Sequence, residues 1–76
     1  MPKLPVVSGK QAVKAFERLG YHVARQRGSH IRLLHPSDSS RKPLTIPAHR
    51  ELGHGLLRKL LRDAGLTPEE FSDLLS

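Results

Sequence analysis

The chain has no cysteine and no tryptophan, and it has only two phenylalanines and one tyrosine among 76 residues. The absence of cysteine excludes disulfide scaffolds and thiolate metal sites, and it fits the reducing cytoplasm, where we expect the protein to reside. A chain this short buries only roughly 60% of its unfolded surface, which leaves little room for an internal cofactor pocket. We therefore expect one domain over residues 1–76, with any active site on its surface.

Long hydrophobic runs are also missing. The N-terminal arm, residues 1–7, contains two prolines and no apolar stretch, so it is neither a signal peptide nor a membrane span. We expect a soluble protein with no membrane partner. The arm is also too short and proline-rich to reach across a sheet and pack there.

Acidic residues are scarce in the first two-thirds of the chain. Residues 1–50 carry ten Lys or Arg and two Asp or Glu, a charge of +8, whereas residues 51–76 carry −2 and the whole chain +6. A basic region of this size is typical of a protein that binds a polyanion. The alternative is an ordinary solubilising surface.

Three amphipathic helices are predicted from capping signals and apolar periodicity. The first lies between Ser8, which has a capping-box glutamine three residues later, and Gly20. The second covers residues 56–64, where leucines repeat at helical spacing. Thr67, followed by Pro-Glu-Glu, begins a short third helix that runs to about Leu75.

Three strands are expected between the first two helices. Two basic runs, residues 21–27 and 30–35, flank Gly28-Ser29, and a short run over 43–46 is stopped by Pro47. Proline at both ends of the third run suits an edge strand. The predicted fold class is α+β: a helix, a three-stranded antiparallel sheet, a helix and a short C-terminal helix, with the helices on one face of the sheet.

His30 is the main catalytic candidate. It begins a strand directly after the Gly28-Ser29 turn, and strand alternation places it with Arg32 on the face opposite Ile31. Leu34 breaks the apolar alternation, which a bulge or a strand end would explain. Imidazole is an efficient general acid or base near neutral pH, and neighbouring guanidinium groups can hold a phosphodiester. The residues predicted to bind this phosphodiester are Arg25, Arg27, Ser29 and Arg32.

The other histidines are weaker candidates. His49 follows the third strand and is a possible second acid or base, although a loop histidine bonded to backbone is the alternative. His22, His35 and His54 are interpreted as surface or loop residues. No pair has the i, i+4 spacing of a zinc helix and carboxylates are sparse nearby, so we expect neither metal nor cofactor. Ser29 lacks the strand-to-helix elbow of a hydrolase nucleophile.

Taken together, these features resemble the HicA-type (YcfA-like) toxins of bacterial toxin–antitoxin pairs. The similarity runs in order from about Ser8 to Phe71 and depends on order and spacing, since no single motif is specific. The matching segments are Leu19-Gly20-Tyr21, Arg25-Gln26-Arg27-Gly28-Ser29-His30, Pro47-Ala48-His49, Gly55 with Leu57-Arg58, and Asp63-Ala64-Gly65-Leu66.

The resemblance implies an α-β-β-β-α fold similar to that of double-stranded RNA-binding domains. It also implies ribosome-independent cleavage of mRNA, with the histidine of Gly-Ser-His, here His30, essential for activity. The implied partner is a HicB-type antitoxin that covers the site, so the protein is expected to be a monomer alone and a hetero-oligomer with antitoxin. One departure is Leu56, which stands where the family usually has threonine, and no role is transferred to it.

Two functions from different classes remain open at this point. The first is a metal-independent endoribonuclease that uses His30. The second is a non-catalytic RNA-binding module, which the composition and fold suit equally well because A-form RNA is recognised largely by shape and phosphate contacts. A small protein that binds an acidic partner shares the same basic face. The histidine held by a turn favours the nuclease, because simple binding does not need it.

Overall fold

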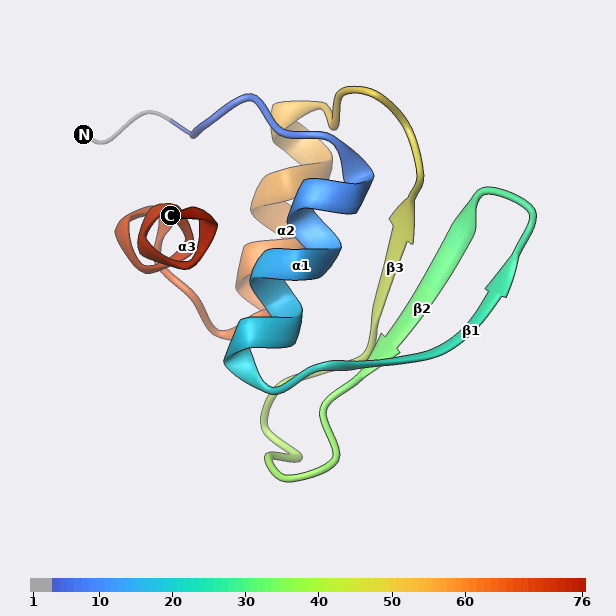
Figure 1. Ribbon diagram of the computed structural model, residues 1–76. Helices are drawn as coiled ribbons and strands as arrows, with labels where there is room; N and C mark the ends of the chain where they lie inside the picture. The colour runs from blue at the N-terminus through green and yellow to red at the C-terminus, as the bar shows by residue number, and fades with distance from the viewer. Residues whose placement is uncertain (1–3) are drawn as a thin grey trace.

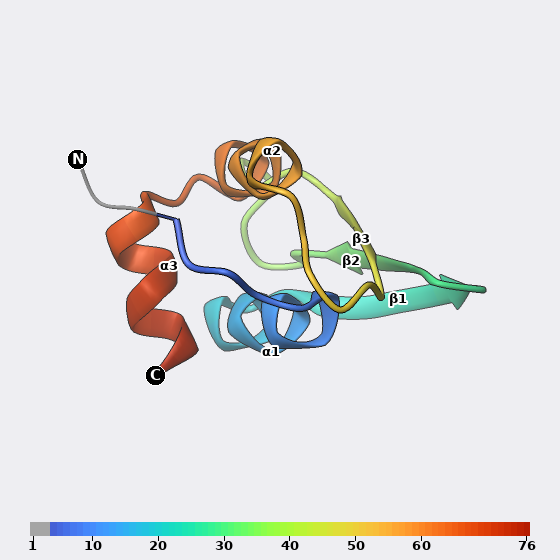
Figure 2. The ribbon, with the colours of Figure 1, turned by 90° about the horizontal axis from the view of Figure 1, so that it is seen from above.

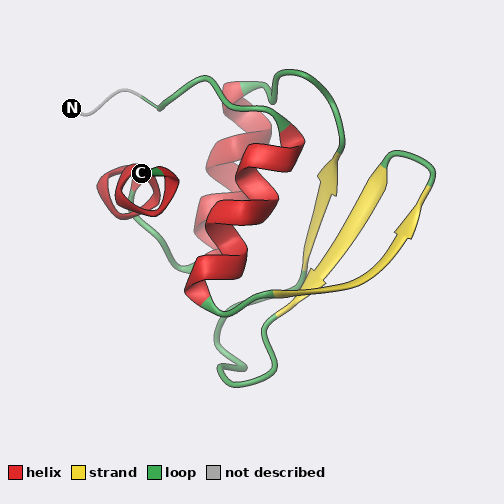
Figure 3. Cartoon of the chain, viewed as in Figure 1, coloured by secondary structure: helices red, strands yellow, loops and turns green. Residues whose placement is uncertain are grey.

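The computed structural model describes residues 4–76 as three helices and three strands. The helices are α1 (Gly9–Leu19), α2 (His54–Ala64) and α3 (Pro68–Leu75), and the strands are β1 (His22–Arg27), β2 (His30–Leu34) and β3 (Leu44–Pro47). Their order along the chain is α-β-β-β-α-α. Figure 3 shows how the helical and strand halves of the molecule separate in space.

The elements form layers. Helices α1 and α2 lie side by side between the sheet and α3, as the two views in Figures 1 and 2 show. The sheet is antiparallel with strand order β1-β2-β3, so β1 and β3 are its edges. The predicted α+β class is therefore confirmed, and the arrangement is consistent with that of double-stranded RNA-binding domains.

The buried hydrophobic side chains form one cluster that every element except β1 enters. Its aromatic centre is Phe16 on α1, whose ring centroid lies 5.8 Å from that of Tyr21 and 5.4 Å from that of Phe71. Within the described part of the chain, no helix is long and apolar enough to cross a membrane. The predicted domain of residues 1–76 includes residues 1–3, which lie outside the described residues.

The predicted helix ends are confirmed where local signals specify them. Ser8 and Thr67 both form complete capping boxes, each with a side chain three residues later that bonds back to the capping residue. The Thr67 amide donates a 2.9 Å hydrogen bond to the Glu70 carboxylate and holds the pKa of that carboxyl below its usual value. Helix α2 differs, because it begins at His54, two residues before the predicted start, and its N-cap Gly53 offers no side-chain bond.

The N-terminal arm packs onto the helices. Leu4 and Val7 are buried, and the Leu52 amide donates a hydrogen bond of 2.8 Å to the Val7 carbonyl. The arm therefore packs on the helical side and does not reach across the sheet, in agreement with the prediction. Its first three residues lie outside the described residues.

A two-residue turn joins β1 to β2. Arg27 pairs with His30 on either side of Gly28-Ser29, and Gly28 has φ +56° whereas Ser29 has negative φ. Glycine at the first central position with positive φ at that residue alone is typical of a type II′ turn, whose twist suits a hairpin. The turn therefore sets the register of the hairpin.

Strand β3 corrects one predicted boundary, because Pro47 is its last residue and does not stop it. The Ala48 amide donates a 2.6 Å hydrogen bond to the Ser29 carbonyl, so the neighbouring pair His30–Pro47 occupies a non-hydrogen-bonded position. An amide at that position would point away from β2, so proline loses no ladder bond there. The prediction that this strand lies at an edge is confirmed.

Candidate nucleic-acid interface and active site

Five side chains line a shallow hollow of about 130 Å³ on the face of the sheet that points away from the helices. They come from all three strands and include no acidic residue. The lining residues are Arg25, Arg27, His30, Arg32 and Thr45. The structure therefore brings together the predicted catalytic histidine and the three predicted arginines.

Alternation along β2 explains why these side chains face solvent. Ile31 and Leu33 are buried against the helices, whereas His30 is exposed and Arg32 is half-buried on the other face. Leu34 is 42% exposed, which places it on the face of His30, so the alternation is geometrically intact. Strand β2 ends at Leu34, which is one of the two expected explanations, and the register shift of the hairpin lies in β1, between Val23 and Arg25.

Strand pairing places like charges opposite one another. Arg25 pairs directly with Arg32, and Arg27 pairs with His30 two positions further along, on the same face of the sheet. Directly opposite residues have Cβ atoms about 4.5–5.5 Å apart, and like charges in such a pair are destabilising. Neither of the two ion pairs within residues 4–76 involves these arginines. An anion bound in the hollow would relieve the repulsion between them.

Thr45 is a site residue that sequence reasoning missed. Its hydroxyl accepts a 3.1 Å hydrogen bond from Nη1 of Arg32, its cross-strand partner. By the alternation described above, this pair is also non-hydrogen-bonded, and side chains approach most closely at such pairs. In a short apolar strand a threonine is explained by its preference for β-structure alone. Its contact with Arg32 becomes evident only from the register between β2 and β3.

Two other predicted site residues lie at the same end of the sheet but outside the hollow's lining. Ser29 is exposed in the turn, where its carbonyl accepts the bond from Ala48. His49 is exposed two residues beyond Pro47, the partner of His30, and its carbonyl accepts a 2.9 Å bond from the Gly9 amide. A Cβ at Gly9 would overlap the Pro47 carbonyl, so glycine lets α1 begin close to this segment.

The remaining histidines lie away from the hollow. His22 and His54 are exposed, as expected. His35 lies in the loop after β2, but it is half-buried: its Nε2 is 3.0 Å from the Leu19 carbonyl, and its ring meets that of Tyr21 edge-on at 5.0 Å. We therefore interpret His35 as a structural residue that joins the end of α1 to the loop after β2.

Neither a metal cluster nor a helix N-terminus contributes to the hollow. Across residues 4–76, no group of three His, Asp or Glu side chains is close enough to hold a metal ion. The start of α2, which the family resemblance singled out, has Leu56 packed against the core in place of a hydroxyl. The chemistry available in the hollow is thus imidazole proton transfer beside guanidinium groups.

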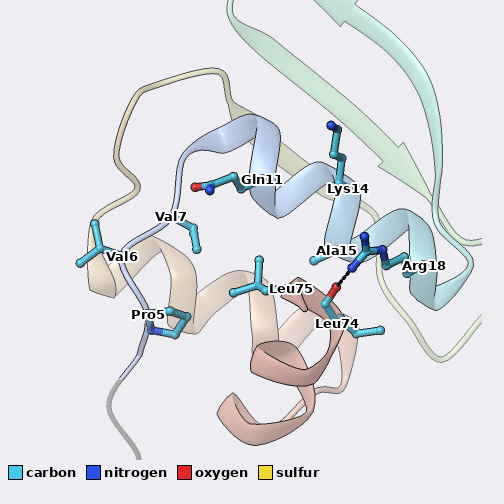
Figure 4. A pocket seen from close by; sticks show the side chains of 9 residues that line it. All are labelled: Pro5, Val6, Val7, Gln11, Lys14, Ala15, Arg18, Leu74 and Leu75. Carbon is cyan, nitrogen blue, oxygen red and sulfur yellow. Dashed lines mark hydrogen bonds between the residues drawn. The ribbon is translucent and has the colours of Figure 1, made fainter.

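Another cavity, of about 220 Å³, lies between the N-terminal arm, α1 and α3 (Figure 4). Arg18 crosses one side of it and donates 2.6 Å hydrogen bonds to the carbonyls of Leu74 and Ser76. It shares no residue with the His30 hollow and contains no histidine or carboxylate. This cavity therefore offers neither imidazole nor carboxylate for acid–base chemistry, and Arg18 there holds α3 against α1.

Comparison with known proteins identifies one family. Residues 9–66, more than half of the chain, match the model of the family described as HicA toxin of bacterial toxin-antitoxin systems. No curated protein matches the chain. The matched segment contains every residue that lines the hollow.

The contact between Thr45 and Arg32 generates a prediction. Thr45→Val removes the acceptor that orients Arg32 and keeps a β-branched shape, so affinity for an uncleavable 2′-O-methyl RNA should fall roughly two- to five-fold, as for loss of one exposed hydrogen bond. Thr45→Ser retains the hydroxyl and should bind as tightly as the unmodified protein. Titration by fluorescence anisotropy measures both, and equal affinity of the valine and serine variants would contradict the role of Thr45.

Proposed function

The chain belongs to the HicA toxin family of bacterial toxin–antitoxin systems, and from this premise we propose that it is an mRNA interferase. In this proposal it is a metal-independent endoribonuclease, with His30 as general acid or base and no cofactor. The protein acts in the cytoplasm, where mRNA is available, as a single domain whose one hydrophobic cluster supports the sheet. Family membership also implies a cognate antitoxin.

The observation that carries the proposal is the pair of facing arginines beside His30. Arg25 lies directly opposite Arg32, and this pair of like charges destabilises the sheet because no carboxylate lines the hollow to neutralise it. The phosphate of RNA carries the charge that would relieve this strain, and its oxygens can accept bonds from guanidinium groups. His30 lies two pairs further along the same ladder, opposite Arg27 and on the same face as the two arginines.

The proposed reaction begins at the ribose 2′-hydroxyl. His30 takes the proton from this hydroxyl, and the 2′-oxygen attacks the adjacent phosphorus, so a bond from phosphorus to the 2′-oxygen forms. Negative charge grows on the non-bridging oxygens of the phosphate. Arg25, Arg27 and Arg32 stabilise this charge, in the manner of preorganised donors that face the transition state.

The second half of the reaction breaks the bond from phosphorus to the 5′-oxygen. The leaving 5′-oxygen must receive a proton, and we assign this role to His49 or to a water molecule. His49 follows Pro47, the cross-strand partner of His30, but it does not line the hollow in the free protein. A site with one well-placed histidine is expected to be slow, because each positioned acid or base contributes about 10²–10⁴-fold.

Control of the toxin is proposed to act in trans. The hollow is open, and the N-terminal arm packs on the helical side, where Leu4 and Val7 are buried. No described segment of the chain lies over His30 as a lid. We propose that a HicB-type antitoxin with an acidic or polar surface covers the basic face, so that a free monomer becomes an inactive hetero-oligomer.

A non-catalytic RNA-binding module is the alternative function. The arginine ladder suits it equally well, since phosphate contacts alone give strong binding without sequence readout. Such a module has no need of an imidazole between the arginines. The two functions therefore differ in what removal of His30 does.

His30→Ala should abolish cleavage and leave binding intact. The side chain is exposed, so its loss removes a reactive group and no core volume; we expect the cleavage rate to fall about 10²–10⁴-fold. Purified protein and a labelled mRNA fragment, with EDTA present, measure the rate. His22→Ala, which removes an exposed histidine at the other end of the hairpin, is the matched control.

Two outcomes of this assay count against the proposal. Undiminished cleavage by a folded His30→Ala protein would favour another catalytic group. Loss of activity of the unmodified protein in EDTA, with recovery on adding a divalent ion, would favour a metal-dependent reaction.

Neutralising one arginine of the hollow should make RNA binding less dependent on salt. Each phosphate contact contributes about −0.7 to −0.9 to the slope of log affinity against log salt concentration. Arg25→Gln or Arg32→Gln should therefore make this slope less negative by about 0.7 to 0.9, the contribution of one phosphate contact. Either variant should weaken binding to all RNA sequences alike. Arg58→Gln, on the exposed side of α2, is the control. An unchanged slope in both hollow variants would place the RNA elsewhere.

A further inference from the structure

A second hollow lies on the other face of the β1–β2 hairpin, between the hairpin and α1. Its volume is about 280 Å³, and we call it the α1–hairpin groove. The lining residues are Lys10, Val13, Lys14, Glu17, Val23, Gln26 and Ile31. None of them has a role in the proposed cleavage of RNA.

The floor of the groove is aliphatic. Val13 of α1 and Ile31 of β2 are almost fully buried beneath it, whereas Val23 of β1 is 45% exposed. Within residues 4–76 three large hydrophobic side chains are exposed, namely Val6, Val23 and Leu34. Val6 lines the cavity beside the N-terminal arm, whereas Val23 lines this groove, on the hairpin that carries the His30 hollow. An exposed aliphatic side chain in a hollow with a polar rim gives an apolar side chain of a partner protein a place to pack.

The rim of the groove is positive at one end. Lys10 and Lys14 lie one turn apart on the exposed side of α1, and neither belongs to an ion pair found among residues 4–76. Glu17 follows one turn later, at the other end. This charge pattern suits a ligand that carries carboxylates near Lys10 and Lys14 and an aliphatic group over Val23.

The groove and the His30 hollow are separated by a single strand. Gln26 lines the groove, and its neighbours Arg25 and Arg27 line the hollow on the opposite face. Because β1 is an edge strand, nothing in the sheet lies beyond it, and Figure 1 shows its hairpin projecting away from the helices. A molecule that passes around the free edge of β1 reaches both sites.

We propose that the cognate antitoxin grips β1 from both faces. One of its segments places an aliphatic side chain in the α1–hairpin groove and acidic groups on Lys10 and Lys14, while another part covers His30. The contacts in the groove add to the affinity of the antitoxin at a site that RNA does not use. The antitoxin can therefore displace RNA that competes for the basic face. The inference rests on membership of a toxin–antitoxin family and not on the cleavage chemistry.

A protein suits the groove better than RNA does. A ribose-phosphate chain has no aliphatic group to fill the space over Val23, and Glu17 would repel its phosphates. The register shift between Val23 and Arg25 also interrupts the outer edge of β1, which disfavours simple addition of a regular strand. We therefore expect the antitoxin to bind here by inserting a side chain into the α1–hairpin groove.

Val23→Asp tests the groove, with Val6→Asp as the matched control. Val6 is a valine that is 66% exposed at the cavity beyond the other side of α1, so the two variants add the same charge to exposed aliphatic positions in different hollows. Calorimetry with the purified cognate antitoxin, taken as the product of the adjacent gene, should show affinity at least tenfold weaker for Val23→Asp. Val6→Asp should match the unmodified protein. Thermal melting and binding to uncleavable RNA should be unchanged in both.

A charge variant tests the rim separately. Lys10→Glu with Lys14→Glu should also weaken antitoxin binding and make it less dependent on salt, whereas Arg58→Glu on α2 should not. Unchanged antitoxin affinity in Val23→Asp would overturn the proposal, and so would a loss of RNA binding in that variant. These measurements use no cleavage assay. They would therefore still test the groove if the protein proved not to be a nuclease.

Discussion

The pairing register of β2 is the constraint on which the rest of this structure depends. Side chains alternate along a strand, so a slip of one residue would send His30 and Arg32 into the core and expose Ile31 and Leu33. The two-residue turn at Gly28-Ser29 fixes the register against β1, and burial of the aliphatic face fixes it against the helices. The same interactions that fold the sheet therefore position the hollow.

Much of the fold follows from local signals in the sequence. Capping boxes at Ser8 and Thr67 and the leucine periodicity of α2 each act within a few residues, and they predict the helices closely. The His30 hollow is also largely predictable, because Arg25, Arg27 and His30 lie around one short turn. In this hairpin the residues that specify the local fold are also neighbours in sequence of the residues that form the site.

The remaining features depend on segments that are distant in the sequence. The contact of Thr45 with Arg32 needs the register between β2 and β3, which a loop of nine residues separates and no local pattern encodes. Pro47 continues β3 because of its place in the hydrogen-bonding ladder, which composition cannot show. The half-burial of His35 and the packing of the N-terminal arm arise only when the helices and loops come together.

We propose that imidazole chemistry on the ribose 2′-hydroxyl cleaves RNA in this hollow, and the decisive test of this proposal is the chemistry of the cut ends. Attack by the 2′-oxygen leaves a 2′,3′-cyclic phosphate on one fragment and a 5′-hydroxyl on the other. Mass spectrometry of the fragments from a defined RNA should find these ends, and a single 2′-deoxy substitution at the cleavage position should prevent the cut. Fragments with a 5′-phosphate and a 3′-hydroxyl, or efficient cleavage at the 2′-deoxy position, would contradict the account.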